Sequence, residues 1–261
     1  MKTSLFLRLV LVSGLAALLA YCAKAPYTER SQLMLVSQEQ ETQLGATAAK
    51  DILKKEPIAN DPNTVELVRR VGERIAAVAD RPDFSWAFYV IDEPETINAF
   101  CLPGGKVFVY TGILPLAPDE AQLATVMGHE IAHALARHGA ERMSMALAAE
   151  AGGAVASAAL GFSNPTTANA FMQAYGVATN VGVLLPYSRA QESEADQIGL
   201  ALMAKAGYDP AAAVTFWQNM EKAKEGKAKP PAFLSTHPAD AERIANIERL
   251  IPWARQYSRP N

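Results

Sequence analysis

Residues 127–138 read Met-Gly-His-Glu-Ile-Ala-His-Ala-Leu-Ala-Arg-His, and the interpretation of the whole chain starts from this stretch. It holds three of the four histidines in the sequence. On a helix, which turns about 100° per residue, His129 and His133 lie one turn apart on one face, with Glu130 beside them. Two imidazoles in this arrangement can bind one metal ion. A neighbouring carboxylate can then act as a general base, so the spacing predicts the metal site of a zinc hydrolase.

The same stretch is predicted to be helical. Pro118, Asp119 and Glu120 supply a start signal with negative charge in the first turn, and an almost unbroken apolar run follows. The competing interpretation is that the histidines are ordinary helix residues. It is disfavoured because buried imidazole and carboxylate groups need a partner that offsets their desolvation. In a continuous helix His138 would stand about 140° from His133, so we expect it to face away from the ion, either as a residue that supports a metal ligand from behind or in a structural role.

The composition of the 261 residues is that of an ordinary globular protein, with 50% hydrophobic and 20% charged residues. The formal net charge is −3, and residues 1–21 contribute basic side chains but no acidic one. A protein that binds nucleic acid should carry a basic surplus or stripe, so we expect no nucleic-acid partner. The length suits one large catalytic domain, which we place at residues 30–261.

Residues 1–22 are predicted to be an export signal. Lys2 and Arg8 precede an apolar stretch that is too short to cross a bilayer comfortably and is typical of a signal peptide. Cys22 resembles the cysteine of a bacterial lipoprotein signal, which becomes the lipidated first residue. Tyr21 differs from the small residue that usually precedes this cysteine. Cleavage shortly after Cys22 and an uncleaved anchor therefore remain alternatives.

Lipid attachment at Cys22 would hold the protein at a membrane. Ala23 is not the aspartate that commonly retains lipoproteins at the inner membrane, so the resemblance implies the periplasmic side of the outer membrane. Residues 23–29 are predicted to form a flexible tether. A disulfide between Cys22 and Cys101 is formally possible in an oxidising compartment, but we do not expect it because one end lies in the leader.

Hydrophobic periodicity predicts helices and a small sheet ahead of the metal helix. Helices are predicted at 37–54 and 61–79, and aromatic and β-branched runs predict strands at 84–91 and 107–110. Pro103-Gly104-Gly105 marks a tight turn between the strands. The predicted fold class is therefore α+β and mostly helical. Downstream we expect helices at 144–161, 166–184, 188–205 and 240–250, and a linker at 222–231.

A third metal ligand must come from elsewhere, because a catalytic zinc ion usually has three protein ligands. Within the predicted helix at 188–205, Glu192 and Asp196 share one face, whereas Glu194 lies about 200° from Glu192. Glu192 fits as a ligand and Asp196 as the carboxylate that orients a metal-binding imidazole. The spacing alone leaves a solvated acidic face as the alternative.

Three motifs together resemble the gluzincin metallopeptidases, the family of the CAAX prenyl endopeptidase, HtpX and the Oma-type peptidases, and in particular their bacterial exported and lipoprotein members. They are His-Glu-Ile-Ala-His at 129–133, Ser-Arg-Ala-Gln-Glu-Ser-Glu-Ala-Asp-Gln-Ile-Gly at 188–199, and Ser-Thr-His-Pro at 235–238 with Arg-Ile at 243–244. The resemblance covers residues 30–252. It implies a zincin-like catalytic domain with one zinc ion per chain, bound by His129, His133 and Glu192.

The resemblance also implies roles for two later residues and for one strand. It places His237 near the metal and Arg243 near the substrate oxyanion. His237 could occupy the open zinc position at rest or hydrogen-bond the reaction intermediate, and the residues alone leave a surface loop histidine open. Gluzincins bind an extended peptide along the exposed edge of the sheet beside the metal helix. We predict that this edge is formed by Lys106, Val107, Phe108, Val109 and Tyr110.

Together these features predict a zinc endopeptidase with Glu130 as its general base. Pairing through the main chain recognises backbone rather than side chains, so it suits unfolded or misassembled envelope proteins, and an envelope assembly machinery is a candidate partner. One alternative is a zinc-regulated periplasmic chaperone or assembly factor with little proteolysis, although a regulatory metal site would not need Glu130. The other is an inert structural lipoprotein.

Overall fold

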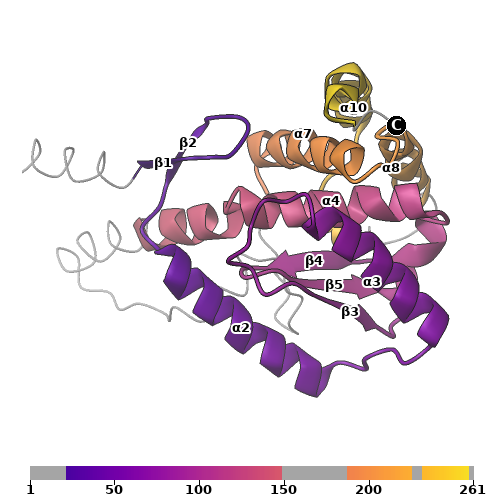
Figure 1. Cartoon of the computed structure of the whole chain (residues 1–261), viewed down its shortest axis with the longest axis horizontal. Coiled ribbons are helices and arrows are strands. Elements are labelled where there is room, and N and C mark those ends of the chain that lie inside the picture. Colours follow the sequence, from indigo (N-terminus) through magenta and orange to yellow (C-terminus); the bar gives the residue numbers. More distant parts are fainter. Residues whose placement is uncertain (1–21, 149–186, 225–230, 259–261) are drawn as a thin grey trace, which may run out of the picture.

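Helices surround a small three-stranded sheet in the computed structural model, which describes residues 22–148, 187–224 and 231–258 (Figure 1). This α+β, mostly helical architecture confirms the predicted fold class. None of the helices in these ranges is both long and apolar enough to cross a bilayer. In chain order the elements are β1 (Cys22–Lys24), β2 (Ser31–Leu33), α2 (Gln38–Lys55), α3 (Pro62–Ala76), β3 (Ala87–Ile91), β4 (Ala99–Leu102), β5 (Lys106–Tyr110), η1 (Thr111–Leu116), α4 (Glu120–Leu135), α7 (Arg189–Lys205), α8 (Ala212–Lys222), α9 (Ala232–Thr236), α10 (Ala241–Ala254) and η2 (Arg255–Tyr257).

The sheet has the order β3-β5-β4, with β3 parallel and β4 antiparallel to β5. The prediction that Lys106–Tyr110 forms the exposed edge is therefore wrong, because this strand, β5, is the central one. Residues 107–110 are all buried, because both faces of the sheet are covered. The edge strand beside α4 is instead β4. The predicted Pro-Gly-Gly turn joins β4 to β5, and Gly104 and Gly105 in this turn both have positive φ.

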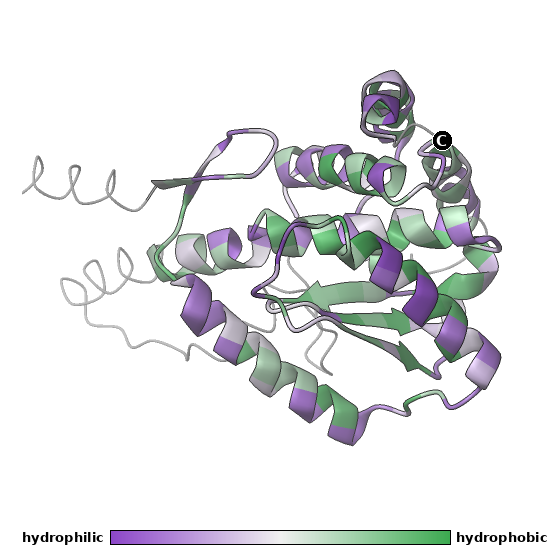
Figure 2. Ribbon diagram, viewed as in Figure 1, coloured by the Kyte–Doolittle hydropathy of each residue, from purple (hydrophilic) through white to green (hydrophobic). Residues whose placement is uncertain are grey.

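Each face of the sheet packs against different helices. Side chains of alternate strand residues, among them Cys101 and Val107, join the core around α3 and α4. Their neighbours Phe100 and Phe108 face the other way, into a smaller core closed by α2. The strands are hydrophobic throughout, and α2 turns its apolar side toward them (Figure 2). The sheet is thus buried on both faces, and α4 lies directly against it.

The helix starts were predictable because side chains cap them. Ser37 and Ser188 form capping boxes at α2 and α7, and Asp61 and Asp119 cap α3 and α4. Each cap satisfies backbone N–H groups of the first turn that have no partner within the helix. The starts of α2, α3, α4 and α7 therefore confirm the predicted ones to within a residue or two.

Helices α4 and α7 cross at two glycines. A Cβ atom on Gly128 would lie 3.2 Å from the carbonyl oxygen of Gly199, and one on Gly199 would lie 3.1 Å from the backbone of Gly128. These separations are tighter than ordinary side-chain contacts, so the backbones approach this closely only because both residues lack a side chain. The crossing brings the His129 end of α4 next to the acidic first half of α7.

The chain turns sharply just after α4. Arg137 has φ 57°, which ends the helix at Leu135, and residues 138–148 are helical again. The side-chain amide of Gln32 donates to the Ala136 carbonyl at this break, over 2.9 Å. Since a left-handed residue redirects the chain, the angle expected for His138 in a continuous helix does not apply.

The N-terminal segment differs from the predicted flexible tether. Strands β1 and β2 pair antiparallel, Cys22 opposite Leu33, and form a hairpin over residues 22–33. Arg30 bonds to Glu141 and Glu194, so the hairpin lies against α7 and the helical segment that follows α4 (Figure 1). Backbone pairing and buried ion pairs fix this segment, and neither is visible in its composition.

Other sequence predictions fall partly or wholly outside the described residues. The helix predicted at 144–161 is seen only up to residue 148, and the one at 166–184 and most of the linker at 222–231 lie outside. The predicted loop before His237 contains a short helix, α9, and α8 was not predicted at all.

Candidate metal centre

Four buried side chains from three parts of the chain converge between α4, α7 and α9. His129 and His133 come from α4, Glu192 from the first turn of α7, and His237 directly follows α9. One ligand atom of each lies within 4.8 Å of those of the other three. The three predicted ligands and the predicted loop histidine are therefore brought together.

The spacing of these four atoms suits a single small cation. His129 Nε2 lies 3.1 Å from His133 Nε2 and 3.2 Å from His237 Nδ1, and Glu192 Oε1 lies 3.3 Å from His133 Nε2 and 2.9 Å from His237 Nδ1. Donors about 2.0–2.1 Å from a tetrahedral zinc ion are roughly 3.3 Å from one another. Nitrogen and carboxylate donors are also ones that zinc binds, so the residues present fit the metal.

The imidazole of His129 is oriented by a carboxylate. Asp196 Oδ1 lies 3.0 Å from His129 Nδ1, which leaves Nε2 directed into the cluster. Burial opposes a positive charge on His129, but Glu192 and Asp196 outweigh it and raise the pKa of His129 to about 9. The carboxylates thus favour positive charge in the cluster, whether from a proton or from a metal ion. Asp196 lies where the sequence spacing predicted.

The imidazole of His133 is oriented less directly. His138 Nδ1 lies 2.8 Å from His133 Nδ1, and His138 Nε2 lies 2.8 Å from Glu194 Oε2. Burial lowers the pKa of both histidines, that of His133 well below its usual range. Glu194 points away from the cluster, as its helical position predicted, but it reaches His133 through His138. Sequence reasoning missed this contact because it assumed a continuous helix.

Glu130 lies at the edge of the cluster with one oxygen free. Its Oε1 atom is buried, has no hydrogen-bond partner among the described residues and lies 3.5 Å from His237 Nε2. Burial raises the pKa of Glu130, and the neighbouring imidazoles of His237 and His129 partly oppose this. A buried carboxylate oxygen without a partner is costly unless water or a ligand uses it, so its position suits a proton acceptor beside a metal.

Arg243 enters from the first turn of α10, as predicted, but it faces the carboxylates. Its Nη1 atom lies 2.6 Å from Glu192 Oε2, and its Nη2 and Nε atoms bond to Asp196 over 2.7 and 2.8 Å. The guanidinium also lies over the ring of Trp217, 3.5 Å from its centroid. Burial opposes ionisation of Glu192, but the His237 and Arg243 charges hold its pKa well below its usual range. In the structure Arg243 balances the charge of Glu192 and Asp196, and the role near the substrate oxyanion that the resemblance implies stays a prediction.

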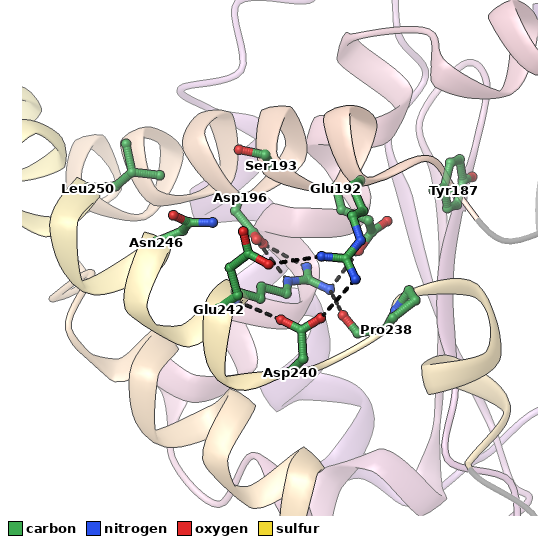
Figure 3. A pocket seen from close by; sticks show the side chains of 11 residues that line it. Tyr187, Glu192, Ser193, Asp196, Pro238, Asp240, Glu242, Asn246 and Leu250 are labelled. Carbon is green, nitrogen blue, oxygen red and sulfur yellow. Dashed lines mark hydrogen bonds and ion pairs between the residues drawn. The ribbon is translucent and has the colours of Figure 1, made fainter.

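Aromatic rings enclose the histidines. Tyr187 packs on His133 with ring centroids 4.0 Å apart, and Phe233 packs on His237 with centroids 4.5 Å apart. Neither residue was singled out in the sequence, since lone aromatic residues are common in cores. Beside them a pocket of roughly 170 Å³ opens between α7 and α10, where Glu192, Asp196 and Pro238 line it (Figure 3).

The fold and this cluster define the class of protein, a metallopeptidase with the His-Glu-x-x-His motif on its active-site helix. Peptidase family M48 matches residues 62–251. The chain is 40% identical to the mitochondrial metalloendopeptidase OMA1 of Schizosaccharomyces pombe over 88% of its length, and 36% identical to the human metalloendopeptidase OMA1 over 88%. It is 30% identical over 79% of its length to the β-barrel assembly-enhancing protease of Escherichia coli.

The chain therefore belongs to peptidase family M48. It spans 66%, 46% and 43% of the lengths of these three relatives. The predicted resemblance to the gluzincin family is thereby confirmed, whereas its lipoprotein branch stays a prediction.

Proposed function

We propose that this protein is a zinc endopeptidase that hydrolyses unfolded or misassembled proteins of the bacterial envelope. The observation that carries the proposal is the cluster of His129, His133 and Glu192 with the free oxygen of Glu130 beside it. A structural metal site would need no such carboxylate. Zinc is the metal expected because two imidazoles and one carboxylate are the ligand set of many zinc peptidases.

A bound zinc ion would supply a Lewis acid for the scissile carbonyl and would acidify a water molecule. The chain's own part begins with Glu130, whose buried Oε1 accepts a proton from the attacking water and passes it to the leaving amine. Both transfers need the carboxylate close to the cluster, and the 3.5 Å separation of its Oε1 atom from His237 Nε2 supports this role.

We assign His237 the task of capping the cluster at rest, with stabilisation of the oxyanion as the alternative task. In the arrangement described, its Nδ1 atom lies among the other three donors, which supports the capping role at rest. Substrate hydrolysis then requires the imidazole to move off this position, and it can hydrogen-bond the developing oxyanion from there. Arg243 acts as a positioning residue, because its donors hold Glu192 and Asp196.

The substrate edge moves from β5 to β4 in this proposal. Tyr110 N–H donates to the Asn98 carbonyl, so in the antiparallel ladder the backbone groups of Ala99 and Cys101 point away from β5. Phe233 N–H donates to the Ile97 carbonyl on the same outer side, which brings α9 and the following His237 next to this edge. An extended peptide paired with β4 would therefore run past the cluster.

The envelope role draws on the leader and on the relatives. The predicted export signal and lipidated Cys22 would place the domain on the periplasmic side of the outer membrane, with the membrane itself as a partner through the lipid. The name of the Escherichia coli relative, a β-barrel assembly-enhancing protease, supports a role near an envelope assembly machinery. A zinc-regulated chaperone with little proteolysis is the competing function.

Metal analysis together with casein hydrolysis tests the proposal. The purified chain should contain one zinc ion, lose casein hydrolysis on chelation and recover it when zinc is restored. Glu130→Gln should keep zinc and remain folded without hydrolysing casein. Zinc binding without any chelator-sensitive hydrolysis would favour the chaperone. Mass spectrometry of the protein from cells should find a lipid on Cys22, and an unmodified N-terminus at Pro26 would contradict the anchor.

A further inference from the structure

A chain of hydrogen bonds links the metal centre to the N-terminal hairpin. His138 is fully buried, and its two ring nitrogens lie 2.8 Å from His133 Nδ1 and 2.8 Å from Glu194 Oε2. The sharp turn at Arg137 makes this possible, because it directs the first residue of the next helical segment back toward α4. His138 thereby lies behind a ligand, on the side opposite the other donors.

The hydrogen bonds in this chain have a defined direction. A carboxylate can only accept, so His138 Nε2 donates to Glu194. The 2.8 Å contact between the Nδ1 atoms of His138 and His133 has room for one proton, and metal binding through His133 Nε2 would place that proton on His133, which leaves His138 Nδ1 as the acceptor. His133 Nδ1 must then carry the proton and donate to His138, and its Nε2 keeps the lone pair. That is the tautomer able to bind a metal through Nε2.

Glu194 is held in turn by the N-terminal hairpin. Arg30 Nε donates to Glu194 Oε2 over 2.7 Å, and Thr28 also donates to Glu194. The remaining Arg30 nitrogens bond both oxygens of Glu141 over 2.7 Å each. The Glu194 side chain is 3% exposed, so its charge needs these partners. Thr28 and Arg30 lie outside residues 62–251, the part matched by the family.

We propose that Arg30, Glu194 and His138 act as a hairpin relay that positions His133 and fixes its metal-binding tautomer. These three are positioning residues, since none of them lies within the donor cluster. The inference rests on the proposed metal centre with His133 as a ligand. It adds that the N-terminal hairpin is a working part of that centre, so that undocking the hairpin weakens metal binding.

A purely structural role for the same contacts predicts a different outcome. If the relay only stabilised the fold, its loss would lower the unfolding temperature of the metal-free protein but leave the zinc affinity and the ligand field unchanged. The zinc dissociation constant, measured by chelator competition, and the visible absorption spectrum of the Co²⁺-substituted protein report on the ligands themselves.

The test uses the full chain with paired variants. His138→Phe keeps the ring but removes the acceptor, and we expect a zinc affinity about 10–100-fold weaker with an altered Co²⁺ spectrum. His138→Asn should recover most of the affinity, because its side-chain oxygen can take the place of Nδ1. Arg30→Met should weaken zinc binding by a few-fold. Lys24 lies in the same hairpin, and its amine donates to Ser31 rather than to Glu194, so Lys24→Met should leave zinc binding unchanged.

Two results separate the inference from the proposed function. A wild-type protein that binds no zinc would overturn the metal centre and the relay with it. A wild-type protein that binds zinc, with the affinity and Co²⁺ spectrum unchanged in folded His138→Phe and in Arg30→Met, would overturn the relay alone. Should His138→Phe fail to fold, Arg30→Met decides, because Arg30 is partly exposed and its loss leaves the core intact.

Discussion

The two imidazoles of α4 stand one helical turn apart, yet opposite ends of the chain support them. His129 bonds directly to a carboxylate, Asp196, which Arg243 of α10 holds in place. His133 reaches its carboxylate only through a second imidazole, and that carboxylate is held by Arg30 of the N-terminal hairpin.

We call Asp196 and Arg243 the C-terminal support of His129. The hairpin relay is the corresponding support of His133. The C-terminal support lies wholly within residues 62–251, the range matched by the family. The hairpin relay depends on a segment outside that range. Identical ligands in one motif can therefore differ in how much of the chain must be folded before each is ready to bind.

Removing the ligands themselves should have the largest effect, and it tests whether both supports serve one ion. His129→Ala, His133→Ala and Glu192→Ala should each lose most of the bound zinc and all casein hydrolysis, because two protein ligands hold zinc far more weakly than three. Metal analysis after dialysis measures this. Full zinc retention in Glu192→Ala, with loss in Glu194→Ala, would mean that the two carboxylates had been assigned the wrong tasks.

Glu130→Gln should abolish hydrolysis without disturbing either support of the metal ligands. The amide fills the same space but cannot act as a base, so casein hydrolysis should fall by on the order of a hundredfold to ten-thousandfold, with zinc content and unfolding temperature unchanged. Initial rates and metal analysis on the same preparation check this. An active Glu130→Gln protein would refute the mechanism.

Asp196→Asn should break the C-terminal support alone. An amide can accept a hydrogen bond from His129 Nδ1 but loses the charge that Arg243 balances, so we expect zinc affinity to fall about 10–100-fold. Chelator competition measures it, and comparison with His138→Phe ranks the two supports. Equal losses would show that the indirect support is as effective as the direct one. An unchanged affinity would remove Asp196 from the metal centre.

His237→Ala probes a donor that belongs to neither support, and the smallest change is expected there. If His237 caps the cluster at rest, hydrolysis of casein should rise by a few-fold, since the open position becomes free. If it mainly stabilises the intermediate, turnover should instead fall by on the order of a hundredfold at constant zinc content. The capping geometry favours the rise. Unchanged rates in both His237→Ala and Arg243→Ala would return this loop to a structural role.

Local signals in the sequence were sufficient for the elements that carry the site. Capping residues such as Asp119 and Ser188 mark the starts of α4 and α7, and helical spacing separates Glu192 and Asp196 from Glu194. Short-range geometry of this kind depends only on residues a few positions apart, so it can be read from one chain. The metal motif and the faces of both helices were obtained in this way.

Features fixed by contacts between distant residues could not be obtained. The turn at Arg137 places a non-glycine residue in the left-handed region, and the residues on either side do not predict this conformation. The same holds for the order of the strands, where β5 was predicted to be the edge strand but is the central one. In the sequence Arg30 is one charged residue in a polar segment after the leader. Its partners Glu141 and Glu194 lie more than a hundred positions away, so only the structure reveals them.

If Cys22 carries a lipid as proposed, the paired hairpin would also limit how far the active site can move from the membrane. Cys22 is the first residue of β1 and pairs with Leu33, so no slack chain separates a lipid on this cysteine from the folded domain. With a lipid there, the domain would stay close to the bilayer and would adopt only a narrow range of orientations. Only polypeptide segments that emerge within about one domain's height of the membrane surface would come within its reach.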